Sequence, residues 1–541
     1  MSQPSALSKQ KISSSLSKEE SYMVMGIAAL LLFALFFQIG LHPLRHEEPR
    51  RALVALEMLF RGNWIVPTEV GALYYNKPPV YNWLIILSYK IFGSYSELAV
   101  RFFSVLSFIG MGLLVFFNGK KYVSLRFGAY AALFFMVSVD ILYYFSLTGE
   151  IDLFYSLITL SSFFVIYHYH KQKRYWPLFL FVYLLAAVGT LTKGLPSIAF
   201  VGISLLSWFV FQREFKKLFL PAHFVSFFLF AGIVAGYFWV YSWYEDPTPF
   251  LNRLVFESSQ RTAVDENNGF IDLVSHLFNF PLTNLLNIMP ATLLLPFVFR
   301  KDAVRRLREQ PFITFIALIF AANILLYWIS PGAKARYVYM LYPFPVMFFV
   351  YYYLLPGEHL KEKKTNILHR LIVVLIILVA AAGIAIPFIP PLATHTASPI
   401  VVAALTTGGA LAILWLHLKV KAVRTLSLLL LLVWVRIIFN LTVIPVRAAD
   451  SSEAQGKRDA QKIVNLTDGS PLHVLEGSMI SRTTIFYIER QREQVLNFEG
   501  KILPDHYYMA YEEELKQQNK AYDIIYRFKY KDDSVFLIKF K

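Results

Sequence analysis

Long apolar runs recur along most of this chain, and the charged residues gather in the short segments between them. A run of about 18 or more apolar residues is long enough to cross the hydrocarbon layer of a membrane as a helix. The 541 residues are 56% hydrophobic and only 16% charged, whereas about a quarter of the residues in soluble proteins are charged. The pattern predicts an all-α polytopic membrane protein.

The distribution of basic residues decides which of these runs cross the membrane. The run from Pro79 to Phe92 is short, begins with two prolines and contains Lys90. A lysine at the centre of a span costs about 2.5–3.5 kcal/mol, so we expect this run to lie at the membrane interface in the first outer loop. The strongly basic loops, from Lys120 to Lys419, then share one side, which the positive-inside rule makes cytoplasmic. We therefore predict about 13 transmembrane helices, a cytoplasmic N-terminus and an outer C-terminus.

These boundaries divide the chain into three parts. Residues 1–22 are Ser- and Lys-rich and are predicted to form a disordered cytoplasmic tail. Residues 23–446 form the transmembrane domain, with a first outer loop at 42–80. Residues 447–541 contain short alternating runs at Leu472–Leu475, Tyr522–Phe528 and Ser534–Phe540, which are typical of strands. We expect a small α+β domain on the outer, periplasmic side, acting as a lid, an acceptor-docking surface or a stabilising cap.

Charge and cysteine content narrow the expected partners. The net charge of +16 comes from basic residues in short loops. That is a topology signal rather than a nucleic-acid-binding face, so no nucleic acid is expected. The chain has no cysteine, which excludes disulfides and thiolate metal sites.

The first outer loop carries the densest group of charges, His46-Glu47-Glu48-Pro49-Arg50. Pro49 suits the first turn of a helix, apolar residues follow at helical spacing, and Arg61-Gly62 suits its end. Carboxylates at a helix N-terminus are stabilised by about 0.3–1 kcal/mol each whatever else they do. Glu47 and Glu48 therefore have a structural explanation beside a catalytic one.

Further charges on the same face favour chemistry. Acids follow the third predicted span at Glu150 and Asp152, and the cations set against them are Lys77, Lys193, Lys334 and Arg336. A carboxylate base can take a proton from an acceptor hydroxyl while cations neutralise a departing phosphate. Cations at helix ends also snorkel to the interface, which is the role we favour for Arg336.

Three further features of the chain leave roles open. A metal site from Glu47, Glu150, Asp152 and His276 lacks ligand spacing, so no cofactor is predicted, although a divalent metal stays open. Asp140 and Arg436 lie within apolar runs, where structural roles are favoured, either paired with each other or with other groups. The segment Trp243–Ser275 is long and Asn/Gly-rich, as a lid would be.

A longer string of residues resembles a known family. The string is Glu47-Glu48-Pro49-Arg50, then Glu57-Met58-Leu59, then Gly62-Asn63-Trp64, then Asn76-Lys77-Pro78-Pro79. It resembles the first outer loop of the C-type glycosyltransferases, the family of the lipid A aminoarabinose transferases and protein O-mannosyltransferases. Matches continue at Asp152, at Thr192-Lys193-Gly194, from Glu257 to Arg261 and from Lys334 to Tyr337.

The resemblance implies an inverting transfer of a sugar from a polyprenyl-phosphate donor, on the outer face of the inner membrane. The acceptor would be a lipid A-like lipid, a glycan or a protein, with membrane lipids around the enzyme. Glu47 stands where the family has its catalytic Asp, and Lys77 would contact the donor phosphate. The predicted catalytic residues are Glu47, Glu48 and Asp152. The predicted substrate-binding residues are Arg50, Lys77, Glu150, Lys193, Arg261, Lys334 and Tyr337.

Two points stay open at this stage. The aminoarabinose transferases have a His-Arg pair where this chain reads Asn267-Asn268-Gly269-Phe270, so the sugar and the acceptor are not assigned. The alternative function is a transporter or flippase of lipid-linked sugars. Such a protein would place its polar groups near the middle of the membrane.

Overall fold

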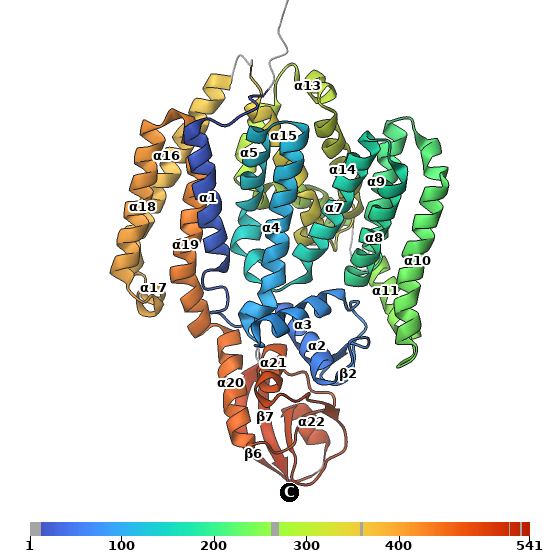
Figure 1. The fold of residues 1–541 in the computed structure, drawn as a ribbon. Coiled ribbons are helices and arrows are strands. Elements are labelled where there is room, and N and C mark those ends of the chain that lie inside the picture. Colours follow the sequence, from blue (N-terminus) through green and yellow to red (C-terminus); the bar gives the residue numbers. More distant parts are fainter. Residues whose placement is uncertain (1–11, 261–269, 357–360, 519, 531–532) are drawn as a thin grey trace, which may run out of the picture.

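The computed structural model describes residues 12–260, 270–356, 361–518, 520–530 and 533–541. A bundle of helices makes up most of the molecule, and a small domain containing a sheet is attached to one end of it (Figure 1). The described helices of the bundle are α1 (Lys18–Phe36), α2 (Glu48–Phe60), α3 (Val80–Phe92), α4 (Glu97–Tyr122), α5 (Leu125–Met136), α6 (Val139–Tyr143), α7 (Ile151–Lys171), α8 (Tyr175–Lys193), α9 (Pro196–Phe211), α10 (Pro221–Tyr241), α11 (Thr248–Gln260), α12 (Phe270–Asn287), α13 (Ala303–Glu309), α14 (Pro311–Trp328), α15 (Pro343–Leu354), α16 (Lys361–Ala385), α17 (Pro390–His395), α18 (Pro399–Lys419) and α19 (Arg424–Asp450).

Nine helices among the described residues are long and apolar enough to cross a membrane. The number rises to 11 if each of two sharply bent pairs, at 125–147 and 271–298, counts as one span. The shorter apolar helices α9 and α15 would bring the total to the predicted 13, while α3 is the run expected at the interface. The membrane class is confirmed at this level; the exact number of spans and the side that faces outward stay predictions. In Figure 1, α2 and α3 lie together at the end of the bundle that carries the C-terminal domain.

The first helix begins earlier than the predicted end of the tail. α1 starts at Lys18 because Ser17 and Glu20 form a reciprocal capping box at its N-terminus. Glu20 is then buried, and its Oε1 accepts hydrogen bonds from Arg126 and from the Tyr130 hydroxyl at 2.7 Å each. Residues 18–22 therefore belong to the helix rather than to a disordered tail.

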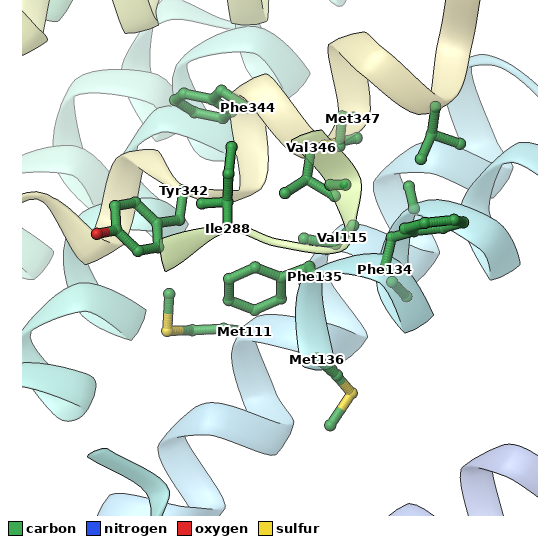
Figure 2. Packing of buried hydrophobic residues seen from close by; sticks show 14 of the residues in the cluster. Met111, Val115, Phe134, Phe135, Met136, Ile288, Tyr342, Phe344, Val346 and Met347 are labelled. Atoms are coloured by element: carbon green, nitrogen blue, oxygen red, sulfur yellow. The ribbon is translucent and has the colours of Figure 1, made fainter. Parts of the chain in front are cut away.

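The centre of the bundle is a large apolar core, and Figure 2 shows the part of it to which α4, α5 and α15 contribute. Two glycines allow α4 and α5 to approach closely, since a Cβ at Gly119 would lie 2.8 Å from the Cα of Gly128. Small residues at helix contacts are a common way to pack spans in a membrane. This tight packing holds the C-terminal end of α4 against the N-terminal part of α5.

The two charges within apolar runs do not pair with each other. The Tyr339 hydroxyl donates a hydrogen bond to the carboxylate of Asp140. Arg436 is fully buried and donates to Asn440 Oδ1 and to Ser146 Oγ, each at 2.9 Å. Both charges contact neutral groups inside the bundle, and Arg436 Nη2 is buried without a hydrogen-bond partner among the described residues. The structural roles of Asp140 and Arg436 stay predictions.

The C-terminal domain contains α20 (Ser452–Thr467), α21 (Arg482–Arg492) and α22 (Glu512–Gln517). Its five-stranded sheet has the order β4-β3-β5-β7-β6. The strands are β3 (Leu472–Leu475), β4 (Phe498–Glu499), β5 (Tyr507–Tyr511), β6 (Tyr522–Tyr530) and β7 (Asp533–Phe540). β3 runs parallel to β4 and β5, and the other pairs are antiparallel. The three predicted strands are present, and α21 packs against α2 of the first loop.

Candidate active site

The start of α2 places the two glutamates in different surroundings. Pro49 occupies the first turn, Glu47 is the N-cap residue, and Arg61 is the C-cap residue, followed by Gly62 in the left-handed conformation at φ 66°. These are the helix limits that the sequence predicts. Most of α2 is buried in the molecule, including ten of its thirteen residues. The helix start is therefore held rigidly.

A polar pocket of about 160 Å³ opens beside this helix start. Segments far apart in the chain meet here: the start of α2, the residues before α3, the start of α7, the end of α8, part of α11 and the 3₁₀ turn η4 (Ala335–Leu341). Its carboxylates are Glu47, Glu150, Asp152 and Glu257, and its cations are Arg50, Arg51, Lys77, Lys193 and Arg336. All of these lie at or near helix ends rather than in the middle of the bundle.

Each carboxylate of the pocket has a cationic partner. Glu47 Oε2 lies 2.6 Å from Arg50 Nη1, and Asp152 Oδ1 lies 2.6 Å from Lys193 Nζ. Glu150 Oε2 lies 3.1 Å from Arg336 Nη1. Lys77 Nζ donates both to Glu257 Oε2 at 2.5 Å and to the Asn76 carbonyl at 2.7 Å. The acids and cations predicted to share one face are thus in direct contact.

Glu47 and Glu48 differ sharply in exposure. The Glu47 side chain is 41% exposed and lines the pocket. Glu48 is fully buried and does not line it; instead it forms an ion pair with Arg101, which is also fully buried. The backbone N–H groups of Arg45 and Gly149 also donate to Glu48, at 3.1 and 2.7 Å. The structure therefore gives Glu48 a supporting position in place of the predicted catalytic one.

Glu150 is an acid of the pocket whose pKa is strongly raised. It is the N-cap residue of α7, is buried, and has one carboxylate oxygen without a hydrogen-bond donor. Burial, reinforced by the negative charge of Asp152, raises the pKa of Glu150 to about 8, although Arg336 acts against this shift. A carboxyl group that titrates near neutral pH can hold or release a proton during a reaction.

Arg51 is a cation that the sequence did not single out. It is 5% exposed, lines the pocket, and forms no ion pair with a carboxylate among the described residues. Its Nη1 is buried without a hydrogen-bond acceptor, and its guanidinium lies 5.6 Å from the ring centre of Tyr74. A buried guanidinium with a free donor is suited to a bound anion.

Two predicted binding residues do not join the pocket. Lys334 is exposed and does not line the pocket. The chain turns into η4 directly after it, and Arg336 of that turn contacts one of the acids instead. Arg336 therefore pairs with Glu150, contrary to the interfacial role favoured for it. Arg261 lies outside the described residues, so its predicted role stays a prediction.

The predicted metal ligands do not form a cluster. His276 is not part of the pocket lining, and its Nε2 lies 3.2 Å from the carbonyl oxygen of Tyr327. No group of three or more His, Asp or Glu side chains that could hold a metal ion occurs within the described ranges. The divalent metal that the sequence leaves open therefore has no described cluster of ligands behind it.

Of the predicted site residues, the pocket unites Glu47, Arg50, Lys77, Glu150, Asp152, Lys193 and Tyr337. Sequence reasoning assigned no role to Arg51 and Asn76 and left Glu257 unassigned. Their signals were present, since Arg51 follows Arg50, Asn76 precedes Lys77, and Glu257 lies in a motif of the resemblance. Which of two neighbouring residues faces a pocket depends on helix rotation, which sequence alone gives poorly.

The fold resembles that of a solved protein. It aligns with the crystal structure of ArnT from Cupriavidus metallidurans bound to undecaprenyl phosphate, with a TM-score of 0.68 and 17% identity over 96% of this chain and 98% of that one. The apo form of the same protein aligns with a TM-score of 0.67 and 16% identity. At this identity the likeness concerns the fold.

Sequence comparisons point the same way. Residues 76–239 match the family model described as dolichyl-phosphate-mannose-protein mannosyltransferase. Proteins named undecaprenyl phosphate-alpha-4-amino-4-deoxy-L-arabinose arabinosyl transferase match over about a third of their length: 29% identity over 176 residues in Edwardsiella ictaluri, and 31% over 200 residues in Pseudomonas savastanoi pv. phaseolicola. The resemblance to the C-type glycosyltransferases is confirmed.

Proposed function

We propose that this protein is an inverting glycosyltransferase that uses a polyprenyl-phosphate sugar as donor. The relatives named for aminoarabinose transfer make an amino sugar and a lipid A-like acceptor the first pair to test; a glycan or protein acceptor is a further candidate. The positive-inside rule puts the pocket and the C-terminal domain on the outer, periplasmic face of the inner membrane.

One observation carries this proposal: an accessible carboxylate, Glu47, lies in a pocket that contains five cations. Transfer from a phosphate-linked donor needs a base on one side of the sugar and positive charge on the other. Glu47 is the most exposed of the paired pocket carboxylates, and Arg50 holds it in place through a 2.6 Å contact. Both requirements are thus supported by side chains within a single pocket.

The proposed reaction is a single displacement. Glu47 removes the proton from an acceptor hydroxyl, and that oxygen attacks the anomeric carbon of the sugar. A new carbon–oxygen bond forms while the bond between the anomeric carbon and the phosphate oxygen breaks. The electron pair leaves with the polyprenyl phosphate, whose added negative charge the cations of the pocket stabilise. The configuration at the anomeric carbon inverts.

Lys77 and Arg51 are the proposed ligands of the donor phosphate. Lys77 is 8% exposed and contacts Glu257 of α11, so a phosphate could replace Glu257 as its partner. Arg51 already has a donor atom without an acceptor. Because Lys193 and Arg336 are engaged by Asp152 and Glu150, they are better suited to orient those acids toward the sugar or acceptor.

The transporter alternative predicts a different placement of polar groups. Carriers of this kind bind substrate at broken helices near the middle of the membrane. Here the acids and cations lie at one end of the bundle, at helix ends. The matched relatives are also named as transferases.

A transfer assay with two matched variants tests the proposal. Purified Glu47→Gln protein should lose transfer by a factor of about 10² or more, since general base catalysis contributes about 10²–10⁴. Glu245→Gln makes the same chemical change at an exposed residue outside the pocket and should transfer normally. Full activity of Glu47→Gln, at unchanged expression and membrane insertion, would refute Glu47 as the base. Mass spectrometry of lipids and glycans from a deletion strain identifies the sugar and acceptor.

A further inference from the structure

A second polar cavity, of about 290 Å³, lies where the C-terminal domain meets the start of α2. We call it the junction pocket. Its walls come from the first turns of α20 and α21, the end of β6, and His46 and Pro49 beside α2. The start of α2 separates the two pockets: Glu47 and Arg50 line the first, whereas His46 and Pro49 line the junction pocket.

One wall of the junction pocket is rich in hydrogen-bond donors. Ser481 precedes α21, but its side chain makes no capping hydrogen bond, so the first N–H groups of that helix lack the usual acceptor. Arg482 and the exposed Lys529 add positive charge to the same cavity. A helix N-terminus flanked by two cations is suited to a phosphate group.

Thr484 gives an independent indication of a ligand. It is 1% exposed, lines the junction pocket, and makes no side-chain hydrogen bond within the described part of the chain. Buried hydroxyl groups normally have a partner. Gly456 of α20 faces it, and a Cβ built there would lie 2.9 Å from Thr484 Oγ1. The glycine therefore keeps open the space over this hydroxyl.

The opposite charge is also present in the junction pocket. Glu453, in the first turn of α20, is a carboxylate among the lining residues. It disfavours a bare phosphate ion, but it can accept hydrogen bonds from hydroxyl groups or from an ammonium group. A ligand with a phosphate at one end and such donors at the other satisfies both walls.

We propose that the junction pocket binds a phosphorylated sugar, with the phosphate at Arg482, Lys529 and the start of α21 and the sugar at Glu453. This proposal deepens the proposed function. The identification of this ligand as the headgroup of the acceptor rests on that function. The pocket adjoins the helix that carries Glu47, and an acceptor anchored there would reach the base from the C-terminal domain side.

Ion pairs connect this site to the base. Arg482 pairs with Glu69 of β1 (Thr68–Glu69). The same Glu69 oxygen lies 3.5 Å from Arg50 Nε, and Arg50 holds Glu47. A phosphate bound at Arg482 would compete with Glu69 for that guanidinium and so change the setting of Arg50. Acceptor binding is thereby linked to the position of Glu47.

Binding can be measured without any transfer reaction. The probes are glucosamine 1-phosphate, inorganic phosphate and glucosamine, added to the purified full-length protein while its thermal midpoint is followed. A Lys77→Ala background reduces phosphate binding at the first pocket. We expect glucosamine 1-phosphate to act at concentrations at least tenfold lower than inorganic phosphate, and glucosamine to have no effect.

Matched variants locate the effect. Lys529→Ala removes a charge-assisted contact, and Gly456→Ala fills the space over Thr484 with a residue that favours a helix. Each should raise the required concentration of glucosamine 1-phosphate about tenfold or more. Lys501→Ala, at an exposed lysine of the same domain outside the cavity, should leave it unchanged.

Several outcomes would overturn the proposal. Equal potency of inorganic phosphate and glucosamine 1-phosphate would refute recognition of the sugar by the junction pocket. Equal responses of Lys529→Ala, Gly456→Ala and Lys501→Ala would show that the junction pocket is not the binding site. The absence of stabilisation by any probe would refute the proposal as well. The transfer assay of Glu47→Gln tests the first pocket, whereas the binding assay tests the junction pocket. The two proposals can therefore fail separately.

Discussion

The buried pair of Glu48 and Arg101 gives a decisive test of how the two neighbouring glutamates divide their roles. Changing Glu48 to Gln keeps the shape of the side chain but removes its charge. Glu48 accepts from Arg101 Nε at 2.6 Å, from Arg101 Nη2 at 3.0 Å and from two backbone N–H groups. A Gln amide would turn one of these acceptor positions into a donor facing other donors.

The cost can be worked from this geometry. Both side chains are fully buried, so the variant leaves the charge of Arg101 inside the protein without its counter-charge. Breaking one partner of a buried ion pair costs about 3–5 kcal/mol. Arg101 still donates to the carbonyl oxygens of Ile39 and His42, at 2.5 and 2.9 Å, which keeps it in place but cannot neutralise it. At about 2.1 cal/mol/K of unfolding entropy per residue, the expected fall in thermal midpoint for a chain of 541 residues is roughly 3–4 °C.

The assay compares Glu48→Gln with Glu47→Gln in one detergent, by thermal midpoint and by transfer rate at low temperature. Glu47 is 41% exposed, so its variant should unfold at the wild-type temperature and yet be inactive. Glu48→Gln should unfold early and keep measurable transfer below its midpoint. A Glu48→Gln protein of wild-type stability without transfer would refute the reasoning and return Glu48 to the reaction.

Two further predictions concern the cations and the buried acid. Lys77→Ala should raise the KM for the donor about tenfold or more with a smaller effect on kcat, whereas Lys334→Ala, outside the pocket, should leave steady-state kinetics unchanged; equal effects would contradict the phosphate role of Lys77. The pKa of Glu150 is raised from 4.5 to about 8, so its contribution to stability is complete below about pH 4.5 and is lost as the pH rises through about 8. Thermal midpoints between about pH 5 and 9 should fall for wild type and fall less for Glu150→Gln; parallel curves would exclude Glu150 as the cause.

The elements that the sequence predicts most accurately are those where local patterns of residues and the constraints of the membrane apply together. Strands β3, β6 and β7 were predicted within about two residues, because polar residues bound each of these short runs of aromatic and aliphatic residues. β5 was missed: it is five residues long and contains only aromatic and apolar residues, so no alternation of polar and apolar positions marks it as a strand. α20 was missed as well, although Ser451 caps it, because its composition is polar and little apolar periodicity stands out.

The candidate site shows a sharper limit. The acids and cations near Glu47 could be grouped by the side of the membrane they share, since topology follows from loop charge. The sequence could not show which member of a neighbouring pair faces the pocket, because Glu47 and Glu48 differ only by about 100° of helix rotation. The choice between Lys334 and Arg336 depends on the tight turn of η4, which has no strong sequence signature.

The contact between Glu69 and Arg482 joins residues 413 positions apart. During synthesis, α2 leaves the ribosome long before α21 exists, so this contact can form only after the whole bundle has been made. A chain cut between α19 and α20 would keep the local pair of Arg50 and Glu47 but would lose the Arg482 partner of Glu69.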